Sequence, residues 1–228
     1  MNYSEVPVVT IDGPAGSGKG TVARRLAENL NYNYLDSGAL YRILALHSQQ
    51  QNVDSNNLEQ VVKICDAMHI QFEAATMDEY AHVYLNNEDI SAQLRTEACA
   101  ARASRLAEHA EIRLALLEKQ HAFRVLPGLV AEGRDMGTVV FPNAMPKFFL
   151  TASPQVRACR RQKQLIKQGI SASLDRLLKE IKARDIRDME RAISPLRPAA
   201  DAVLLDSTEL SIDQVVQQMV VHVKDGTD

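Results

Sequence analysis

Glycine, lysine and threonine are spaced at residues 13–21 as a phosphate-binding loop requires. The segment Gly-Pro-Ala-Gly-Ser-Gly-Lys-Gly-Thr follows a short β-branched run at 8–12 and precedes a helix-forming run, which is the strand–loop–helix order of a P-loop. Its glycines can adopt backbone angles closed to other residues, so successive N–H groups can point into one anion-sized hollow. The pattern therefore predicts a site for a nucleoside triphosphate.

Two side chains of this loop carry the chemistry. Lys19 supplies a mobile full charge for the β- and γ-phosphates, and the Thr21 hydroxyl can reach a magnesium ion bound with the nucleotide. The residue after the lysine is Gly20, a form typical of nucleoside monophosphate kinases. The alternative, a glycine-rich turn that binds nothing, is disfavoured because the lysine, the threonine and both flanking elements are present. The loop residues predicted to bind ATP are Gly13, Pro14, Ala15, Gly16, Ser17, Gly18, Lys19, Gly20 and Thr21.

Length and composition suit one α/β domain with insertions, since the chain has 228 residues. Its net charge of −3 offers no global basic field for nucleic acid, although basic residues cluster at 157–191. No apolar run is long enough to span a membrane, and three separated cysteines form no C-x-x-C. We therefore expect a cytoplasmic protein that binds neither membrane nor nucleic acid.

Apolar strands alternate with helical segments along most of the chain, which predicts a parallel sheet covered on both faces. Ligands of such sheets lie beyond the carboxyl ends of the strands. Residues 70–90 instead read as antiparallel strands, with Asn86-Asn87 as a hairpin turn. The strands of the parallel sheet are expected at 8–12, 32–36, 129–131, 147–151 and 202–206.

Capping residues predict where several helices begin. Asp54-Ser55 should cap a helix that runs to Met68, and Ser153, with proline after it, should cap another. Ser211 should cap the closing helix, and residues 94–124 should form one long helix or two.

A basic stripe is expected on the helix that follows Leu174. Residues Arg184, Arg187, Asp188 and Arg191 are spaced at offsets 0, 3, 4 and 7, which places them on one helical face. Taken alone, such a run is more often a solvated face with i,i+4 ion pairs. Beside a P-loop, it is expected to cover the charge spread over a transferring phosphoryl group.

The sequence resembles bacterial cytidylate kinases along nearly its whole length. DSGA-x-YR and GRDMGTVVFP are specific to that family, whereas the P-loop is shared by all nucleoside monophosphate kinases. The segments that carry the resemblance are GPAGSGKGT (13–21), DSGALYR (36–42), LPGLVAEGRDMGTVVFP (126–142), EIKARDIRDMER (180–191) and PAADAVLLDS (198–207).

The resemblance implies a P-loop three-layer α/β/α fold with a five-stranded parallel sheet. Residues 1–46 and 125–228 would form the core, residues 47–95 a nucleotide-binding insert with a small antiparallel sheet, and residues 157–195 a helical lid. It also implies a monomer that transfers a phosphoryl group from ATP, with Mg²⁺, to CMP or dCMP.

Site residues are assigned through the resemblance, at the positions that match the family's motifs. The catalytic residues would be Lys19, Arg134, Arg184 and Arg191, with Arg157 and Arg161 as lid contacts to ATP. The residues that contact CMP would be Ser104, Arg113 and Asp135 at the base, Arg184 and Asp188 at the sugar, Arg42, Arg134 and Arg191 at the phosphate, and Ser37 in the same pocket.

The chemistry of cytosine agrees with these base contacts. A carboxylate such as Asp135 accepts from the amino group at position 4, and Arg113 satisfies the ring nitrogen and carbonyl acceptors. In uracil the group at position 4 accepts a hydrogen bond and the ring nitrogen donates one, the reverse of cytosine. Such a mismatch is worth about 1–3 kcal/mol. Glu132 stands where the family often has Asp, so its role as a magnesium ligand through water is left open.

Two other functions remain open from the residues alone. One is a kinase of similar fold that acts on UMP, AMP or a small metabolite such as shikimate. The other is a nucleoside triphosphate-hydrolysing switch or nucleic-acid-binding ATPase, which the acidic net charge disfavours.

Overall fold

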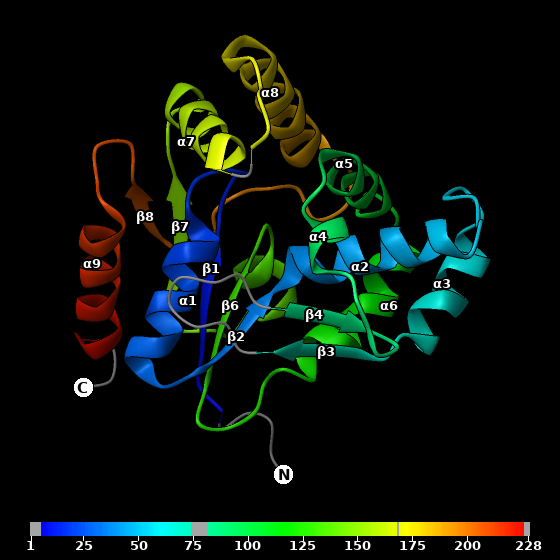
Figure 1. Cartoon of the computed structure of the whole chain (residues 1–228). Coiled ribbons are helices and arrows are strands. Elements are labelled where there is room, and N and C mark those ends of the chain that lie inside the picture. Colours follow the sequence, from blue (N-terminus) through cyan, green and yellow to red (C-terminus); the bar gives the residue numbers. More distant parts are fainter. Residues whose placement is uncertain (1–5, 74–81, 168, 226–228) are drawn as a thin grey trace. The chain divides into compact units, whose positions relative to one another are not determined.

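The computed structural model describes residues 6–73, 82–167 and 169–225 (Figure 1). The chain divides into two compact units. The core unit takes its described residues from 1–36 and 120–228, and the insert unit comprises residues 37–119. The predicted boundaries of the nucleotide-binding insert and the lid stay predictions.

The core unit is built on a five-stranded parallel sheet with strand order β2-β6-β1-β7-β8. The two strands beside each other at its centre, β1 and β6, are buried at every position, as strands covered on both faces should be. The predicted α/β fold class is therefore confirmed. The strands are β1 (Val8–Asp12), β2 (Asn33–Asp36), β6 (Leu129–Gly133), β7 (Lys147–Thr151) and β8 (Val203–Asp206).

Alternation along β1 sends its side chains to opposite faces of the sheet. Val9 and Ile11 join a hydrophobic cluster with apolar residues of α1 (Lys19–Leu30) and α9 (Ile212–Asp225), which cover one face. Thr10 lies on the other face, where the five-residue π-helix η2 packs on the strand. η2 comprises Met136–Val140.

Two helices, α7 (Pro154–Lys167) and α8 (Leu174–Glu190), lie side by side in the core unit (Figure 1). The predicted cap of α7 is confirmed, since Ser153 Oγ accepts from the amide of Val156. The cap of α8 is Ser173, whose Oγ accepts from the amide of Arg176. Gly169, with φ 76°, permits the turn between the two helices. Leu165 and Leu177 pack the pair together. These two helices occupy most of the predicted lid segment 157–195, whose role as a lid stays a prediction.

The insert unit is mostly helical and carries the expected antiparallel sheet, of strand order β3-β4-β5. The predicted helical region 94–124 is divided in two, as α5 and α6. Its elements are α2 (Ser37–Gln50), α3 (Leu58–Ala67), β3 (Ile70–Glu73), β4 (His82–Leu85), β5 (Glu88–Asp89), α4 (Ser91–Leu94), α5 (Glu97–Leu106) and α6 (Ala110–His121), the last ending in the core unit.

One local prediction for the insert unit needs correction. The cap of α3 is Asn57, whose side chain accepts from the amide of Gln60, rather than Asp54-Ser55. The Asp54 carboxylate instead accepts from the amide of Asn56, which forms a turn one step before the helix. The Asn86-Asn87 turn is present, with both residues at positive φ, and it leads into β5, a two-residue strand too short for any pattern to reveal.

Among the helices that the structure describes, none is both long and apolar enough to cross a membrane.

Burial within the parallel sheet predicts how two leucines on neighbouring strands contribute to stability. Leu150 of β7 is 0% exposed and Leu204 of β8 is 65% exposed. Leu150→Ala should lower the free energy of unfolding by about 2–5 kcal/mol through lost burial and a cavity, and Leu204→Ala by less than about 0.5 kcal/mol. Urea unfolding of both variants measures the difference, and equal losses would contradict this assignment of the core.

Candidate active site

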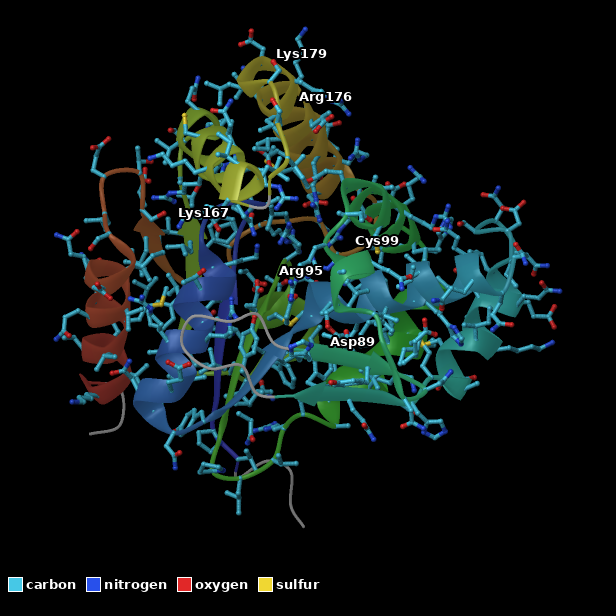
Figure 2. The ribbon with its side chains drawn as sticks, in the orientation of Figure 1. Asp89, Arg95, Cys99, Lys167, Arg176 and Lys179 are labelled. Atoms are coloured by element: carbon cyan, nitrogen blue, oxygen red, sulfur yellow. The ribbon has the colours of Figure 1, made fainter. Side chains whose placement is uncertain are left out.

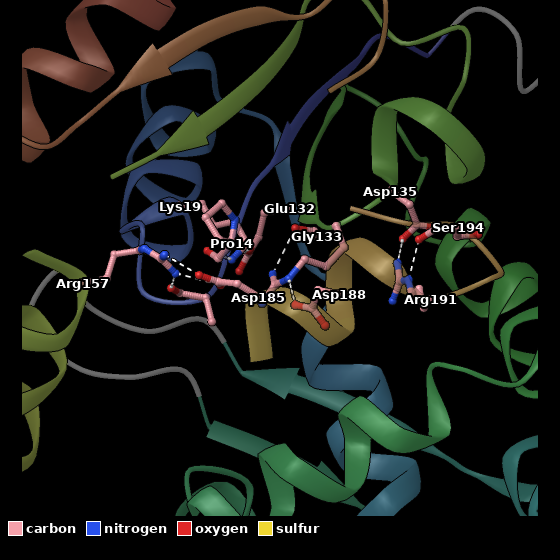
Figure 3. A network of polar contacts seen from close by, with 12 residues as sticks. Pro14, Lys19, Glu132, Gly133, Asp135, Arg157, Asp185, Asp188, Arg191 and Ser194 are labelled. Carbon is pink, nitrogen blue, oxygen red and sulfur yellow. Dashed lines mark hydrogen bonds and ion pairs between the residues drawn. The ribbon is translucent and has the colours of Figure 1, made fainter. Parts of the chain in front are cut away.

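The glycine-rich loop folds back over its own lysine (Figure 3). Lys19, the first residue of α1, donates from Nζ to the carbonyl oxygen of Pro14 at 3.3 Å. Gly18 precedes the helix with φ 93°, a left-handed conformation that favours glycine. A Cβ on Gly13 would collide with the carbonyl oxygen of Leu150, so the loop passes too close to β7 for any other residue. The predicted P-loop geometry is present.

Lys19 lies in a buried and strongly basic environment. Burial, together with the guanidinium groups of Arg134 and Arg184, lowers the pKa of Lys19 to about 8, while the Glu132 carboxylate opposes the shift. Three cationic side chains from α1, the end of β6 and α8 are therefore close enough to repel one another. Such a cluster is stabilised when a polyanion neutralises it.

Glu132 of β6 is the buried carboxylate of this cluster. Its Oε2 lies 3.7 Å from Lys19 Nζ, and its Oε1 accepts from the Tyr34 hydroxyl at 3.4 Å. A Cβ on Gly20 would lie 3.2 Å from the same Oε1, which is tighter than an ordinary contact. The absence of a side chain at residue 20 thus provides the space that Glu132 occupies.

The residues after β6 form ion pairs with the inner half of α8 (Figure 3). Arg134 donates from Nε to Asp188 Oδ2 at 2.8 Å, and both side chains are largely buried. Arg191, at the C-terminal cap of α8, has its Nη2 3.8 Å from Asp135 Oδ1. Burial alone would raise the pKa of Asp188, but Arg134, Arg184 and Arg191 together hold that pKa below its usual value. These interactions bring together the residues of the core unit that were predicted to contact CMP: Arg134, Asp135, Arg184, Asp188 and Arg191.

The basic stripe of α8 is only partly as predicted. Asp188 is buried and Arg184 and Arg191 are half-buried, so this stripe is more than a solvated face. Arg187 is exposed, so it lies at the solvent-facing edge of this stripe. The buried face is centred nearer to Asp185, which is 9% exposed, and this rotation leaves Arg187 outside it.

The outer half of α8 behaves differently. Arg176 and Lys179 extend from the outer end of the helix and are exposed (Figure 2). Arg176 donates from Nε to Glu180 at 2.8 Å in an i,i+4 ion pair. This half therefore matches the solvated arrangement that is usual for charged helical runs.

The two arginines of α7 predicted to contact ATP differ in their surroundings. Arg157 is buried, donates from Nη1 to Asp185 Oδ1 at 2.9 Å, and donates from the same nitrogen to the carbonyl oxygen of Ala15 at 3.0 Å. Arg161 donates to Gln164 at 2.6 Å. Arg157 therefore ties α7 to both α8 and the P-loop, and the contacts of both arginines with ATP stay predictions.

Two residues of this region were not singled out from the sequence. Asp185 is the buried partner of Arg157, and nothing in a run of charged residues distinguishes it from its neighbours. Arg160 donates to the carbonyl oxygens of Ser17 at 3.2 Å and Ser207 at 2.6 Å. Its spacing of three residues from Arg157 could have placed both on one face towards the loop.

The other predicted CMP contacts lie in the insert unit. Ser37 begins α2, and Arg42 lies one turn further along. Arg113 places its guanidinium carbon 5.8 Å from the centroid of the Tyr41 ring. Ser104 of α5 is buried, and no described residue forms a hydrogen bond with its hydroxyl. The expected CMP site is therefore divided between the two units, and its assembly stays a prediction.

A triphosphate-binding loop at the carboxyl end of a parallel sheet, with a basic helix beside it, is typical of P-loop phosphotransferases. The family model described as cytidylate kinase matches residues 9–225. The chain belongs to the cytidylate kinase family.

Curated relatives agree with this assignment. The cytidylate kinase of Pseudomonas entomophila (strain L48) is 53% identical, and the match covers 95% of each chain. The cytidylate kinase of Paraburkholderia xenovorans (strain LB400) is 49% identical over 96% of this chain and 93% of the relative. Among solved structures, a shikimate kinase from Bacteroides thetaiotaomicron is 14% identical with a TM-score of 0.45, over 96% of this chain and 98% of that chain. The family assignment therefore depends on the family model and the curated relatives, and this shikimate kinase carries no part of it.

The charge of Lys19 should make ATP binding depend on pH. Since the pKa of Lys19 is lowered to about 8, the ammonium loses its proton as the pH rises through that value, and ATP affinity should fall there. Glu132→Gln removes the larger of the two carboxylate effects that raise this pKa, the other being that of Asp36, so the midpoint should move to lower pH. Titration of ATP binding from pH 6.5 to 9.5 measures both midpoints.

Glu28→Gln is the matched control, because Glu28 is an exposed carboxylate on the same helix as Lys19. Its midpoint should equal that of the unmodified protein. A Glu132→Gln midpoint that stays in place or moves upward would show that Glu132 does not act on the charge of Lys19.

Proposed function

We propose that the protein transfers the γ-phosphoryl group of ATP to CMP or dCMP and releases ADP with CDP or dCDP. The observation that carries the proposal is the convergence of Lys19, Arg134 and Arg184 at the P-loop, where the carboxylates of Glu132 and Asp36 only partly offset three cations. Membership of the cytidylate kinase family supports cytidine monophosphates as the acceptors. A cytoplasmic location and a monomeric state remain predictions.

In-line transfer between two phosphates explains why these side chains are mainly basic. The acceptor is already a phosphate oxyanion, so no strong general base is needed. Lys19 would contact the β- and γ-phosphates, and Arg134 and Arg191 would bind the acceptor phosphate. Arg184, which lies on the same face of α8 as Asp188, would stabilise the charge that develops on the transferring phosphoryl group.

The ion pairs of the described structure show how the arginines can be held before substrate binds. Arg134 pairs with Asp188, and Arg191 lies near Asp135. When CMP binds, its phosphate would take up the arginines, while the sugar and base would take up the two carboxylates. This exchange would keep the charges of these two pairs partnered in both states, which limits the desolvation cost.

Magnesium would come with the nucleotide, since Mg²⁺ is usually held by phosphates and only one or two protein oxygens. The Thr21 hydroxyl, exposed in the first turn of α1, fits that requirement, and so does the carboxylate of Glu132. The ion would neutralise phosphate charge, while Glu132 also keeps its contact with Lys19.

Lys19→Ala should leave the fold intact and remove most phosphoryl transfer, because it deletes the mobile cation at the transferring phosphate. An ADP-release assay with CMP, dCMP, UMP, AMP and shikimate, with circular dichroism as the folding control, tests the whole proposal. CMP and dCMP should be the preferred acceptors. Preference for another acceptor would replace the proposed substrate, and normal turnover by a folded Lys19→Ala variant would refute the P-loop role.

Asp135→Asn should lower kcat/KM for CMP and narrow the ratio of CMP to UMP activity. The variant keeps the shape of the side chain and loses the charge that accepts from the cytosine amino group. Arg134→Ala is the matched comparison, because a phosphate contact does not depend on the base, and it should weaken CMP and UMP alike. An unchanged CMP-to-UMP ratio in Asp135→Asn would refute the base contact and leave the kinase function standing.

A further inference from the structure

Asp12 is a buried carboxylate that the proposed mechanism does not use. It ends β1, directly before the first glycine of the P-loop, and only 4% of its surface is exposed. Its Oδ1 accepts from the amide of Met136 and its Oδ2 from the amide of Gly137, each at 2.8 Å. Both oxygens of one carboxylate are therefore committed to the first two residues of η2. Charge-assisted bonds of this kind are stronger than those between neutral groups.

The segment that Asp12 binds lies unusually close to the sheet. A Cβ on Gly137 would lie 2.9 Å from Thr10 Oγ1 and 3.1 Å from Lys147 Cδ, so only glycine allows this approach. The carbonyl oxygen of Asp135 in turn accepts from the amide of Val139 at 2.9 Å. The start of η2 is thus held from the sheet side by Asp12 and from within by its own turn.

Arg134 and Asp135 come immediately before the amides that Asp12 binds. Arg134 holds Asp188 at 2.8 Å, and Asp135 lies 3.8 Å from Arg191. A shift of the Met136 amide would therefore move both of these side chains together. Asp12 also adjoins Gly13, so a single residue connects the P-loop to the segment expected to bind the acceptor.

We propose that Asp12 is a positioning residue for the acceptor: by holding the amides of Met136 and Gly137, it fixes Arg134 and Asp135 relative to the P-loop. Asp12 touches neither nucleotide in this scheme and acts only through its neighbours. The inference rests on the proposed function, because it takes Arg134 as a phosphate contact and Asp135 as a base contact.

Asp12→Asn is the direct test. An amide keeps one acceptor and turns a donor group towards a backbone N–H, so one bond is lost and the start of η2 shifts. We expect KM for CMP to rise about ten- to a hundredfold, as the loss of a charged hydrogen bond implies, with a lower CMP-to-UMP ratio. The affinity for ATP should change by less than about threefold, since phosphate binding depends on the loop amides and Lys19.

These readouts separate positioning from a general structural role. A variant that is merely less stable loses active enzyme, which lowers the apparent kcat for all acceptors and leaves KM and the CMP-to-UMP ratio unchanged. Asp206→Asn is the matched control. Its carboxylate ends β8 of the same sheet, and Oδ1 alone accepts from the amide of Thr208 at 2.8 Å and from its hydroxyl at 2.6 Å. The same substitution there removes a charge at a strand end without loss of a backbone hydrogen bond, so KM for CMP should stay constant.

Gly137→Ala provides a second variant in case Asp12→Asn does not fold. It leaves the Asp12 carboxylate in place and pushes the start of η2 away from Thr10, so positioning predicts the same rise in KM for CMP. Amide hydrogen exchange at Met136 and Gly137 should accelerate in whichever variant folds.

The failure of this inference differs from the failure of the proposed function. If the unmodified protein phosphorylates CMP and the folded variants keep its KM and CMP-to-UMP ratio, the positioning role is overturned while the kinase function stands. If the unmodified protein does not phosphorylate CMP, the proposed function falls, and the positioning role falls with it.

Discussion

Buried charge has to be partnered, and this constraint governs the carboxyl ends of the strands. The Asp12 carboxylate shows how large the cost of burying a charge is. Burial raises the pKa of Asp12 to about 7, even though the hydrogen bonds from the amides of Gly137 and Met136 lower that pKa. The same constraint accounts for the pairing of Arg134 with Asp188 and of Arg157 with Asp185. Each pair joins a strand end or α7 to α8, so the partnering of charges also fixes where α8 lies in the core unit.

Local signals in the sequence predicted much of the core unit, because its helices, strands and turns are each determined by a few neighbouring residues. The P-loop, the cap at Ser153 and, in the insert unit, the turn at Asn86-Asn87 each depend on residues that are close in sequence, and all are present. The cap of α3 was misplaced because Asp54, Ser55 and Asn57 are all good capping residues, and sequence alone does not rank them. β5 was missed since two residues carry no periodicity.

The site was less predictable than the fold, because its contacts join residues far apart in sequence. The bond from Asp12 to Met136 and the ion pair of Arg157 with Asp185 span distances that no helical or strand period relates. Ser104 and Arg113 were assigned only through the resemblance to cytidylate kinases, since each looks like ordinary helix polarity. The exposure of Arg187 was not predictable, because helical spacing gives relative directions and leaves the centre of the buried face undetermined.

Glu132 and Gly20 show how a departure from a familiar pattern can be understood as a pair. An acid longer than aspartate brings its Oε1 to the first turn of α1, where a Cβ on residue 20 would approach it to 3.2 Å. The Ser or Thr common after a P-loop lysine would crowd this carboxylate unless its side chain moved. Glycine removes that conflict and leaves Glu132 free to approach Lys19, whose charge it supports. In this chain the absence of a side chain at residue 20 and the position of the Glu132 carboxylate are therefore linked sterically.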